Sequence, residues 1–491
     1  MKQLTDLVTW KLLKSHAEKI CPHRMRDLQK TSFSKYPLTL KQKGIQVDFR
    51  YQQMNEHTLD LLINLAHEKN IREKIASLMS GSNVNTSEEQ PALHTALRVM
   101  DDREILVNGR NIVEDVFDTR EKMRDIAEKI RSLNWYGYSG KPVTAIVNIG
   151  IGGSDLGPRF CVDALNIYTA EYLSYHFISD ADPNAFRNTV KHLNQETTLF
   201  IVSSKSFTTQ ETLLNARKAI DWFGRQDISA HFIAVTVNVN LAKSLGIHYV
   251  LPIWNWVGGR FSFCSAINLI SCIALGFEQF MDILNGAYHI DHHFQSALME
   301  ENIPVMLALV GIWNINFLHI TNMLVLVYAR QLEKFVPYLQ QLDMESNGKS
   351  IDIVGRAVNY ATGPIVWGGL GNQAQHSYFQ LLCQGSHPMM ADFISSSEFN
   401  QDLINDVCYA KMQVLSEGVH AAGRGYIPGG MRLNHIKLEQ CSPFNIGMLI
   451  ALYEHKIYVQ GAIWNINVFD QPGVERAKCA LFSKTPIHID E

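Results

Sequence analysis

Apolar positions change their spacing along the chain, and each change predicts a different kind of element. Residues 59–66 have the apolar spacing of a helix, and residues 1–110 are predicted to be mostly helical. A charged helical pattern, DTREKMRDIAEKIRS, begins at Asp118 and ends at a glycine turn. The short, partly β-branched apolar run at residues 143–149 then follows. Such a run, bounded by turn residues, is typical of a parallel strand buried on both faces.

Further strand-like runs alternate with helical stretches. They lie at residues 199–203, 232–237 and 249–253, and another strand end is indicated at residues 363–369. Alternating strands and helices predict an α/β fold with doubly wound, mostly parallel sheets and flanking helices. The pattern resumes after a long apolar region, which indicates a second α/β unit.

The length of the chain, 491 residues, exceeds what one ordinary hydrophobic core holds, so several domains are expected. We predict a helical N-terminal region at 1–110, α/β domains at 111–275 and 310–465, and a C-terminal helix and tail at 466–491. Residues 261–277 and 305–329 are apolar enough to resemble membrane spans. We predict buried helices instead, because the first is short and the second carries polar side chains that lipid disfavours: Asn314, Asn316, His319 and Asn322.

Composition narrows the classes of partner. Hydrophobic residues at 46% and charged residues at 19% are normal for a soluble globular protein, and the net charge is -4. That charge is too near neutral to predict electrostatic binding of nucleic acid or of an anionic membrane. The eight cysteines are scattered without a CxxC pair, and the charged N-terminus lacks the apolar run of a signal peptide. Both features predict a cytoplasmic protein with reduced thiols.

A glycine-rich corner, GIGGSDLG at residues 150–157, follows the strand at 143–149 and opens a helix. Glycines let the backbone approach an anion, and the first helical N–H groups point toward it. The dinucleotide fingerprint requires glycine where Asp155 stands, and a Walker A loop requires lysine where Pro158 stands. The remaining interpretations of this corner are a site for a smaller phosphorylated ligand and a tight turn without a ligand.

A second corner, SSKSFTTQET at residues 203–212, follows the next predicted strand. Its hydroxyls lie where a helix begins, and they suit the terminal oxygens of a phosphate. The alternative is a helix N-cap, since serine and threonine are favoured there. One cap needs one hydroxyl, so the excess favours a phosphate site.

The heptapeptide DMESNGK at residues 343–349 places Glu345 among small and polar residues. We predict that Glu345 is a general base, although a polar turn containing a helix cap would look the same. Gln341 lies four residues earlier, on the same face if the chain is helical there. Arg260, in VGGRFS, is either a surface residue or a cleft residue whose constant charge stabilises a developing oxyanion.

Three further side chains are candidates. His376 follows a glycine-rich turn and precedes an apolar helix, but a lone histidine is more often structural. Gln471 and Lys478 are seven residues apart, on one face of a helix predicted to begin near Pro472, but a lysine such as Lys478 is more often an ordinary surface residue. The histidine-rich segment HIDHHF at 289–294 lacks an accompanying carboxylate or cysteine cluster, so no metal is predicted.

Six motifs, in this order and at these separations, together resemble the phosphoglucose isomerase (glucose-6-phosphate isomerase) family over about residues 80–480: IGIGGSDLGP, SSKSFTTQET, VGGRFS, QQLDMESNGK, QHSYFQLLCQG and QPGVERAK. The resemblance implies two sugar-isomerase (SIS) type α/β domains and no cofactor or metal. It implies reversible isomerisation of glucose 6-phosphate and fructose 6-phosphate through an enediolate, in glycolysis and gluconeogenesis. It also implies a homodimer with active sites at the subunit interface.

The resemblance assigns roles to individual residues. Glu345 would move the proton and Arg260 would stabilise the enediolate. His376, contributed by the partner subunit, and Lys478 would open the sugar ring. The residues implied to line the sugar-phosphate site are Gly153, Ser154, Ser204, Lys205, Ser206, Thr209, Thr212, Gln341 and Gln471.

The chain departs from the family pattern at several places. The run before His376 reads GLGNQA instead of an EPGTNG-like sequence, Pro472 replaces a tryptophan, and Gln90 replaces an arginine. The region before Gln471 is shortened. None of these departures removes an implied catalytic side chain, so they are expected to affect rate or affinity more than the type of reaction.

Two other functions account for less of the sequence than isomerisation does. A non-catalytic sugar-phosphate-binding module would contain the same phosphate corners, but it would not need Glu345, His376 and Lys478 together. A nicotinamide-dependent dehydrogenase is disfavoured by the glycine spacing at residues 150–157.

Overall fold

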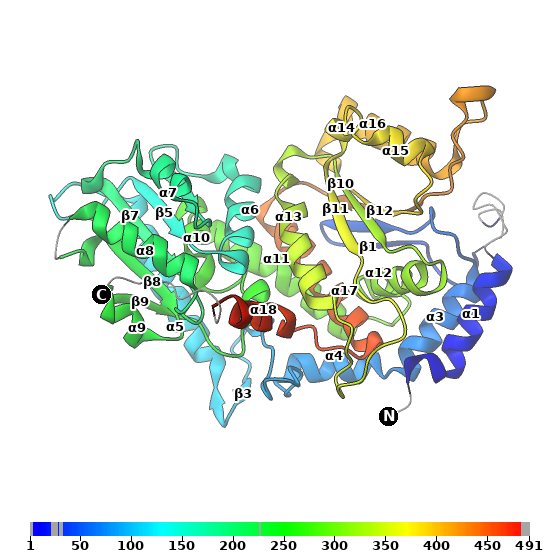
Figure 1. The fold of residues 1–491 in the computed structure, drawn as a ribbon, viewed down its shortest axis with the longest axis horizontal. Coiled ribbons are helices and arrows are strands. Elements are labelled where there is room, and N and C mark those ends of the chain that lie inside the picture. Colours follow the sequence, from blue (N-terminus) through cyan, green and yellow to red (C-terminus); the bar gives the residue numbers. More distant parts are fainter. Residues whose placement is uncertain (1–2, 21–27, 29–32, 225–226, 483–491) are drawn as a thin grey trace.

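The protein is described by a computed structural model covering residues 3–20, 28, 33–224 and 227–482. Two mostly parallel sheets with flanking helices form its framework (Figure 1), as the sequence predicts. The first sheet has the order β6-β5-β7-β8-β9, and all its neighbouring strands are parallel. Its strands are β5 (Ala145–Ile149), β6 (Ser174–Ile178), β7 (Thr198–Ser203), β8 (Phe232–Thr236) and β9 (Tyr249–Pro252). Four of them match predicted strands, and β6 was not predicted.

Successive side chains of the central strands enter two different cores. Val147 of β5 and Phe200 of β7 belong to one buried cluster, whereas Ile146 and Ile201 belong to the other. This alternation is the two-residue period of a strand, and here both faces are apolar because helices cover both. The helices around this sheet are α5 (Ile112–Arg131), α6 (Leu156–Ala164), α7 (Pro183–Val190), α8 (Gln210–Phe223), α9 (Val239–Ser244) and α10 (Leu269–Leu275).

The second sheet has the order β1-β2-β13-β12-β10-β11. Its strands β10 (Asn322–Val327), β11 (Ile365–Leu370), β12 (Met390–Ser396) and β13 (Arg432–Leu438) are parallel where they pair. A hairpin of β1 (Thr39–Gln42) and β2 (Ile45–Asp48) adds antiparallel to β13. This hairpin was not predicted. It lies in the N-terminal region of the chain, which also contains the helices α1 (Val8–Ile20), α3 (Glu56–Glu68) and α4 (Ile71–Ser80).

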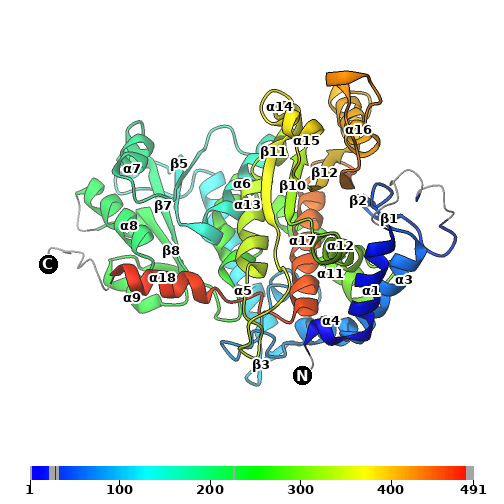
Figure 2. The ribbon, with the colours of Figure 1, turned by 45° about the vertical axis from the view of Figure 1, so that its right-hand side comes forward.

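A long buried helix, α17 (Pro443–Trp464), runs through the middle of the molecule in the view of Figure 2. It packs against α11 (Phe277–Ser296) and α12 (Ile303–Ile312), and nearly all its residues are buried. A helix buried on all sides is expected inside a large core, and two charged side chains of α17 are paired there, Glu454 with Arg98 and Lys456 with Asp343. The remaining elements are β3 (Leu106–Val107), β4 (Arg110–Asn111), α13 (Phe335–Gln340), α14 (Gly371–Ala374), α15 (Phe379–Gln384), α16 (Leu403–Glu417) and α18 (Pro472–Phe482).

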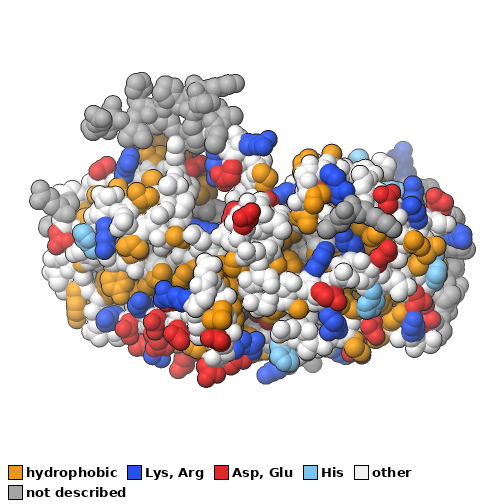
Figure 3. Space-filling view, turned by 90° about the horizontal axis from the view of Figure 1, so that it is seen from below, with side chains coloured by type: hydrophobic (Ala, Val, Ile, Leu, Met, Phe, Trp, Pro, Cys, Tyr) orange, Lys and Arg blue, Asp and Glu red, His pale blue; other side chains and the backbone are white. Residues whose placement is uncertain are grey.

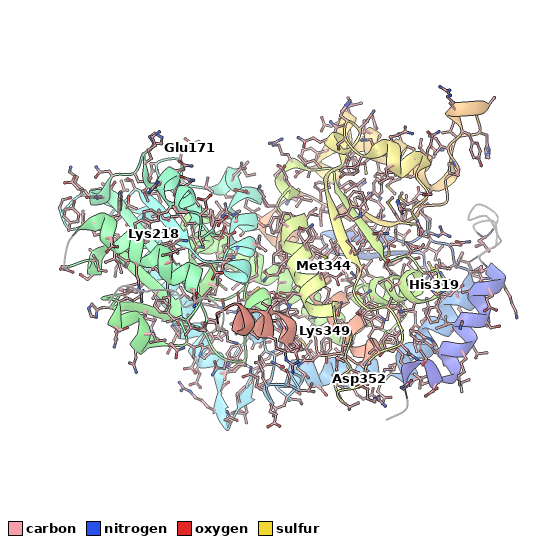
Figure 4. The ribbon with its side chains drawn as sticks, viewed as in Figure 1. Glu171, Lys218, His319, Met344, Lys349 and Asp352 are labelled. Carbon is pink, nitrogen blue, oxygen red and sulfur yellow. The ribbon has the colours of Figure 1, made fainter. Side chains whose placement is uncertain are left out.

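The prediction of one buried helix over residues 305–329 was wrong. Helix α12 ends at Ile312, a π-helical turn covers Trp313–Phe317, and the chain then enters β10. His319, labelled in Figure 4, has a φ of 56° in the turn between them. A continuous apolar run does not distinguish a buried helix from a buried strand, which explains the error. Residues 261–277 are also only partly α-helical, at Leu269–Leu275.

Surface and membrane features agree with the composition. Acidic and basic side chains are interspersed over the described part of the face shown in Figure 3. Within the described residues, no helix is both long enough and apolar enough to cross a membrane. The division into domains at 1–110, 111–275, 310–465 and 466–491 stays a prediction.

Candidate active site

Two strand-to-helix corners lie at the same edge of the first sheet. The first runs from β5 through the 3-10 turn Gly152–Ser154 into α6, and the second runs from β7 into α8. Because β5 and β7 are parallel neighbours, their carboxyl ends meet at this edge, where open α/β sheets commonly bind ligands. Both corners line one pocket of about 850 Å³. The predicted residues that they contribute are Gly153, Ser154, Ser204, Lys205, Ser206, Thr209 and Thr212.

The first corner packs tightly against the segment that carries Arg260. A Cβ atom at Gly153 would lie 2.0 Å from the carbonyl oxygen of Gly259. No side chain fits at that separation, so glycine is required there. The close approach brings the first corner and Arg260 to the same pocket.

The hydroxyls of the second corner do not serve as the N-cap of α8. Thr209 is the N-cap residue, and its side chain makes no capping hydrogen bond. The Thr212 hydroxyl is buried and has no hydrogen-bond partner among the described residues. A buried hydroxyl without a partner is costly unless a ligand or water bonds to it, so the alternative of a simple helix cap explains this corner poorly.

Lys205 supplies positive charge beside these hydroxyls. Its ammonium donates a hydrogen bond to the carbonyl oxygen of Asn255 over 2.8 Å. Burial lowers the pKa of Lys205, and nearby Glu88 opposes this shift. A partly buried ammonium without an adjacent carboxylate bond suits an anionic ligand.

Glu345 ends a π-helical turn, Gln341–Glu345, that continues α13. The Gln341 amide donates to the carboxylate of Glu345 over 3.0 Å, so the two side chains share a face as predicted. Both line the pocket, and the Glu345 side chain is 23% exposed. π-helical turns of this kind occur often at functional sites. The carboxylate is therefore accessible to a ligand while its orientation is held.

Arg260 is not a surface residue, because its side chain is only 3% exposed. Its Nη1 atom lies 3.3 Å from a carboxylate oxygen of Glu345 and donates to Oε1 of Gln471 over 2.9 Å. Its Nε donates to the hydroxyl of Ser346 over 2.7 Å, and Nη2 donates to the carbonyl of Asp470 over 2.9 Å. Burial lowers the pKa of Arg260, but arginine remains charged at neutral pH.

The C-terminal candidates reach the same pocket. Helix α18 begins at Pro472, as predicted, and Gln471 and Lys478 both line the pocket. Lys478 is exposed, and its Nζ lies 3.4 Å from Oε1 of Glu475. His376 is the one predicted site residue that does not line this pocket; it is exposed and follows α14.

Sequence reasoning missed the contribution of one loop to the lining of the pocket. Asn85, Glu88 and Gln90 line it, and the carboxylate of Glu88 accepts hydrogen bonds from the side-chain amides of Asn85, over 3.1 Å, and of Gln90. The sequence VNTSEEQPALH predicts a loop here without indicating its role. The signal was a dense run of polar residues, but their chemistry is not evident from their spacing.

The histidine-rich segment at 289–294 has a structural role. Nδ1 of His293 contacts the side-chain amide of Gln42 at 2.9 Å, and its Nε2 accepts from the N–H of Ile303 over 3.0 Å. Within the part of the chain that the structure describes, no group of three or more potential ligands could hold a metal ion.

Comparison with known protein families decides the classification. The family model described as phosphoglucose isomerase matches residues 48–419 and 422–484. This chain belongs to the phosphoglucose isomerase family. The resemblance found in the six sequence motifs is thereby confirmed.

Individual relatives in the phosphoglucose isomerase family match nearly the whole chain. A glucose-6-phosphate isomerase of Legionella pneumophila (strain Lens) is 55% identical over 484 residues, covering 98% of this chain and 97% of its own. Glucose-6-phosphate isomerase 1 of Chromohalobacter salexigens is 40% identical and covers 97% and 90%. The crystal structure of a glucose-6-phosphate isomerase from Chlamydia trachomatis superposes with a TM-score of 0.90 at 28% identity, covering 99% and 98%. The predicted fold class is confirmed.

Proposed function

We propose that this chain interconverts glucose 6-phosphate and fructose 6-phosphate, with Glu345 as the base that moves the proton. Membership of the phosphoglucose isomerase family and the names of its relatives support the reaction. One observation of the site carries the assignment of Glu345. Its carboxylate lies 3.3 Å from the buried Arg260 guanidinium, in the pocket that both phosphate corners line.

The phosphate of the sugar binds at the two corners. The hydroxyls of Ser204, Thr209 and Thr212 and the ammonium of Lys205 are suited to its oxygens, and the N-terminal end of α8 adds partial positive charge. This places the sugar carbons between the corners and the carboxylate of Glu345.

The chemistry requires one carboxylate and one countercharge. For the aldose, Glu345 takes the proton from C2 and returns it to C1, while a second proton moves between the two oxygens. The intermediate enediolate carries negative charge on oxygen, which Arg260 stabilises electrostatically. Because the guanidinium is already held by Ser346, Gln471 and the backbone, it does not have to reorganise during the reaction.

Opening of the sugar ring uses the remaining candidates, Lys478 and His376. Lys478 lies on the pocket wall, where its exposed ammonium can protonate the ring oxygen or orient it. His376 is exposed and outside the pocket of its own chain, which fits a contribution from a second copy. We propose a homodimer, a cytoplasmic location, and a place in glycolysis and gluconeogenesis.

A subunit-mixing experiment tests the shared site. Glu345→Gln and His376→Ala subunits are each expected to be inactive as homodimers. When the two variant proteins are mixed and reassembled, half of the dimers contain one Glu345→Gln subunit and one His376→Ala subunit. One of the two sites in such a dimer then holds both the native Glu345 and the native His376. Activity should recover to about a quarter of the wild-type value in a symmetric dimer. No recovery, with dimers confirmed by native mass spectrometry, contradicts a His376 contribution across the interface.

Replacing Thr212 by valine tests the phosphate corner. The change removes one hydrogen bond to a charged group, so KM for fructose 6-phosphate should rise about tenfold with little change in kcat. Thr189→Val is the matched control, because among the described residues the Thr189 hydroxyl bonds only to the backbone of α7, and Thr189 does not line the pocket. An unchanged KM in Thr212→Val would place the phosphate elsewhere.

A non-catalytic sugar-phosphate-binding module is the alternative function. A coupled assay on fructose 6-phosphate, with the purified protein and with or without a chelator, separates the two. Turnover that the chelator leaves unchanged supports the proposal of an isomerase without a metal. Binding without turnover supports the alternative.

A further inference from the structure

Lys349 connects two segments of the active site. Its side chain is only 11% exposed, and Nζ donates to the carbonyl oxygens of Glu345 over 3.1 Å, Ser346 over 2.8 Å and Asn467 over 2.8 Å. The same Nζ lies 3.3 Å from a carboxylate oxygen of Asp470. An ammonium has three N–H donors, and the three carbonyls use all of them.

One of these segments carries the base, and the other holds the guanidinium. Glu345 and Ser346 belong to the end of the π-helical turn and the residue after it. The segment from Asn467 to Gln471 supplies three acceptors to Arg260: the carbonyls of Val468 and Asp470 and the side chain of Gln471. Lys349 therefore contacts the backbone beside each of the two charged groups whose separation matters for the reaction.

The position of Lys349 supports this connection. In the view of Figure 4, Lys349 lies close to α18, and it lines the same hollow as Met344, Glu345, Gln471 and the first residues of that helix. This hollow shares Glu345 and Gln471 with the sugar-phosphate pocket, but Lys349 does not line that pocket itself.

We propose that Lys349 is a positioning residue, whose ammonium keeps the Glu345 carboxylate and the Arg260 guanidinium in register for the isomerisation. This inference rests on the proposed function of the site. Lys349 does not need to touch the substrate. It acts by fixing the two backbone segments, so its loss should affect the chemical step more than binding of the sugar phosphate.

The protonation state of Lys349 supplies a distinctive signature. Burial and the nearby Arg260 guanidinium lower the pKa of Lys349 to about 8, while the facing carboxylates of Asp470 and Glu345 oppose this shift. As the pH rises through about 8, the ammonium becomes an amine with two donors and no charge. One carbonyl then loses its hydrogen bond and Asp470 loses its cation, so kcat should fall on the alkaline side.

The test compares Lys349→Met and Lys349→Arg with the wild-type chain in the isomerase assay. Lys349→Met should lower kcat by about tenfold to a hundredfold with a smaller change in KM, since small displacements of reacting groups have effects of this size. The wild-type kcat should fall with an apparent pKa near 8. Lys349→Arg should restore part of the rate and move this alkaline decline to higher pH, because arginine stays charged.

Lys74→Met is the matched control. Lys74 is also half-buried and donates to a backbone carbonyl, that of Ala462, and burial lowers its pKa to about 7, but it does not line the pocket. Its replacement should leave kcat and its pH profile unchanged. Thermal melting of each variant separates loss of folding from loss of rate.

Two results overturn the inference. One is a wild-type kcat without an alkaline decline between about pH 7 and 9, which needs no variant and spans the titration of this lysine. The other is a folded Lys349→Met variant with wild-type kcat. A wild-type chain that does not isomerise fructose 6-phosphate would instead contradict the proposed function.

Discussion

Replacing Glu345 by glutamine should abolish turnover and leave binding of the sugar phosphate nearly unchanged. The amide keeps the shape of the side chain and remains within reach of Gln341 and Arg260, but it cannot take a proton from carbon. Positioned general-base catalysis contributes about 10²–10⁴-fold, so kcat should fall by at least this factor. The coupled assay measures kcat, and calorimetry with fructose 6-phosphate measures binding to the inactive variant.

The matched control for this change is Glu333→Gln. Glu333 lies shortly before α13, is partly exposed, and does not line the pocket, so its replacement should leave kcat unchanged. Loss of binding together with loss of turnover in Glu345→Gln would mean that Glu345 is structural. Normal turnover would mean that another group is the base.

Replacing Arg260 by alanine should lower kcat more than it raises KM. The guanidinium is the cation nearest to the proposed base, and a well-placed oxyanion donor is worth roughly 10²–10³ in rate. Removing the guanidinium also removes the hydrogen bonds that the carbonyls of Val468 and Asp470 accept from it, so the melting temperature should fall as well. Arg260→Lys keeps the positive charge but loses the planar guanidinium with its several N–H donors, and it should retain more activity than Arg260→Ala.

Arg131→Ala controls for the loss of an arginine that donates to backbone carbonyls; Arg131 is half-buried. Arg131 donates to the carbonyls of Ile273 and Ala274, and none of the three lines the pocket, so its loss should reduce stability without reducing kcat. If Arg260→Ala instead raises KM strongly at nearly constant kcat, Arg260 binds the phosphate and does not stabilise the intermediate.

The sequence predicted those parts of the fold that local patterns determine. Strands β5, β7, β8 and β9 are short apolar runs bounded by turns, and each was predicted within a few residues of its ends. The hairpin of β1 and β2 was missed because its strands are short and their pairing with β13 is a long-range contact. Strand β10 was assigned to a helix because no glycine or proline separates its apolar residues from those of α12, and the polar residues between them do not mark a turn.

The candidate site shows the same limit. The i, i+4 contact of Gln341 with Glu345 follows from local helical geometry, and was predicted. The buried contacts of Arg260 with residues 468–471 join segments about two hundred residues apart, and no local pattern contains them. Only the family resemblance predicted that these segments meet in one site, and the roles of individual residues stay proposals.

The structure describes two of the residues at which the chain departs from the family pattern. Pro472, which stands in place of tryptophan, occupies the first position of α18, where the fixed φ of proline is well tolerated. Gln90, which stands in place of arginine, donates a hydrogen bond to Glu88 in the pocket wall. Neither residue contacts the carboxylate of Glu345 through a hydrogen bond or ion pair among the described residues.

Transfer of solvent deuterium to carbon tests the proposed role of Glu345 most directly. The protein is incubated with fructose 6-phosphate in deuterium oxide, and NMR measures deuterium bound to C1 and C2 of the sugar phosphates. The wild-type chain should introduce deuterium at these carbons, because a carboxylate that holds the proton can exchange it with solvent, and Glu345→Gln should introduce none. Deuterium entering at the wild-type rate in Glu345→Gln would show that a different group moves the proton.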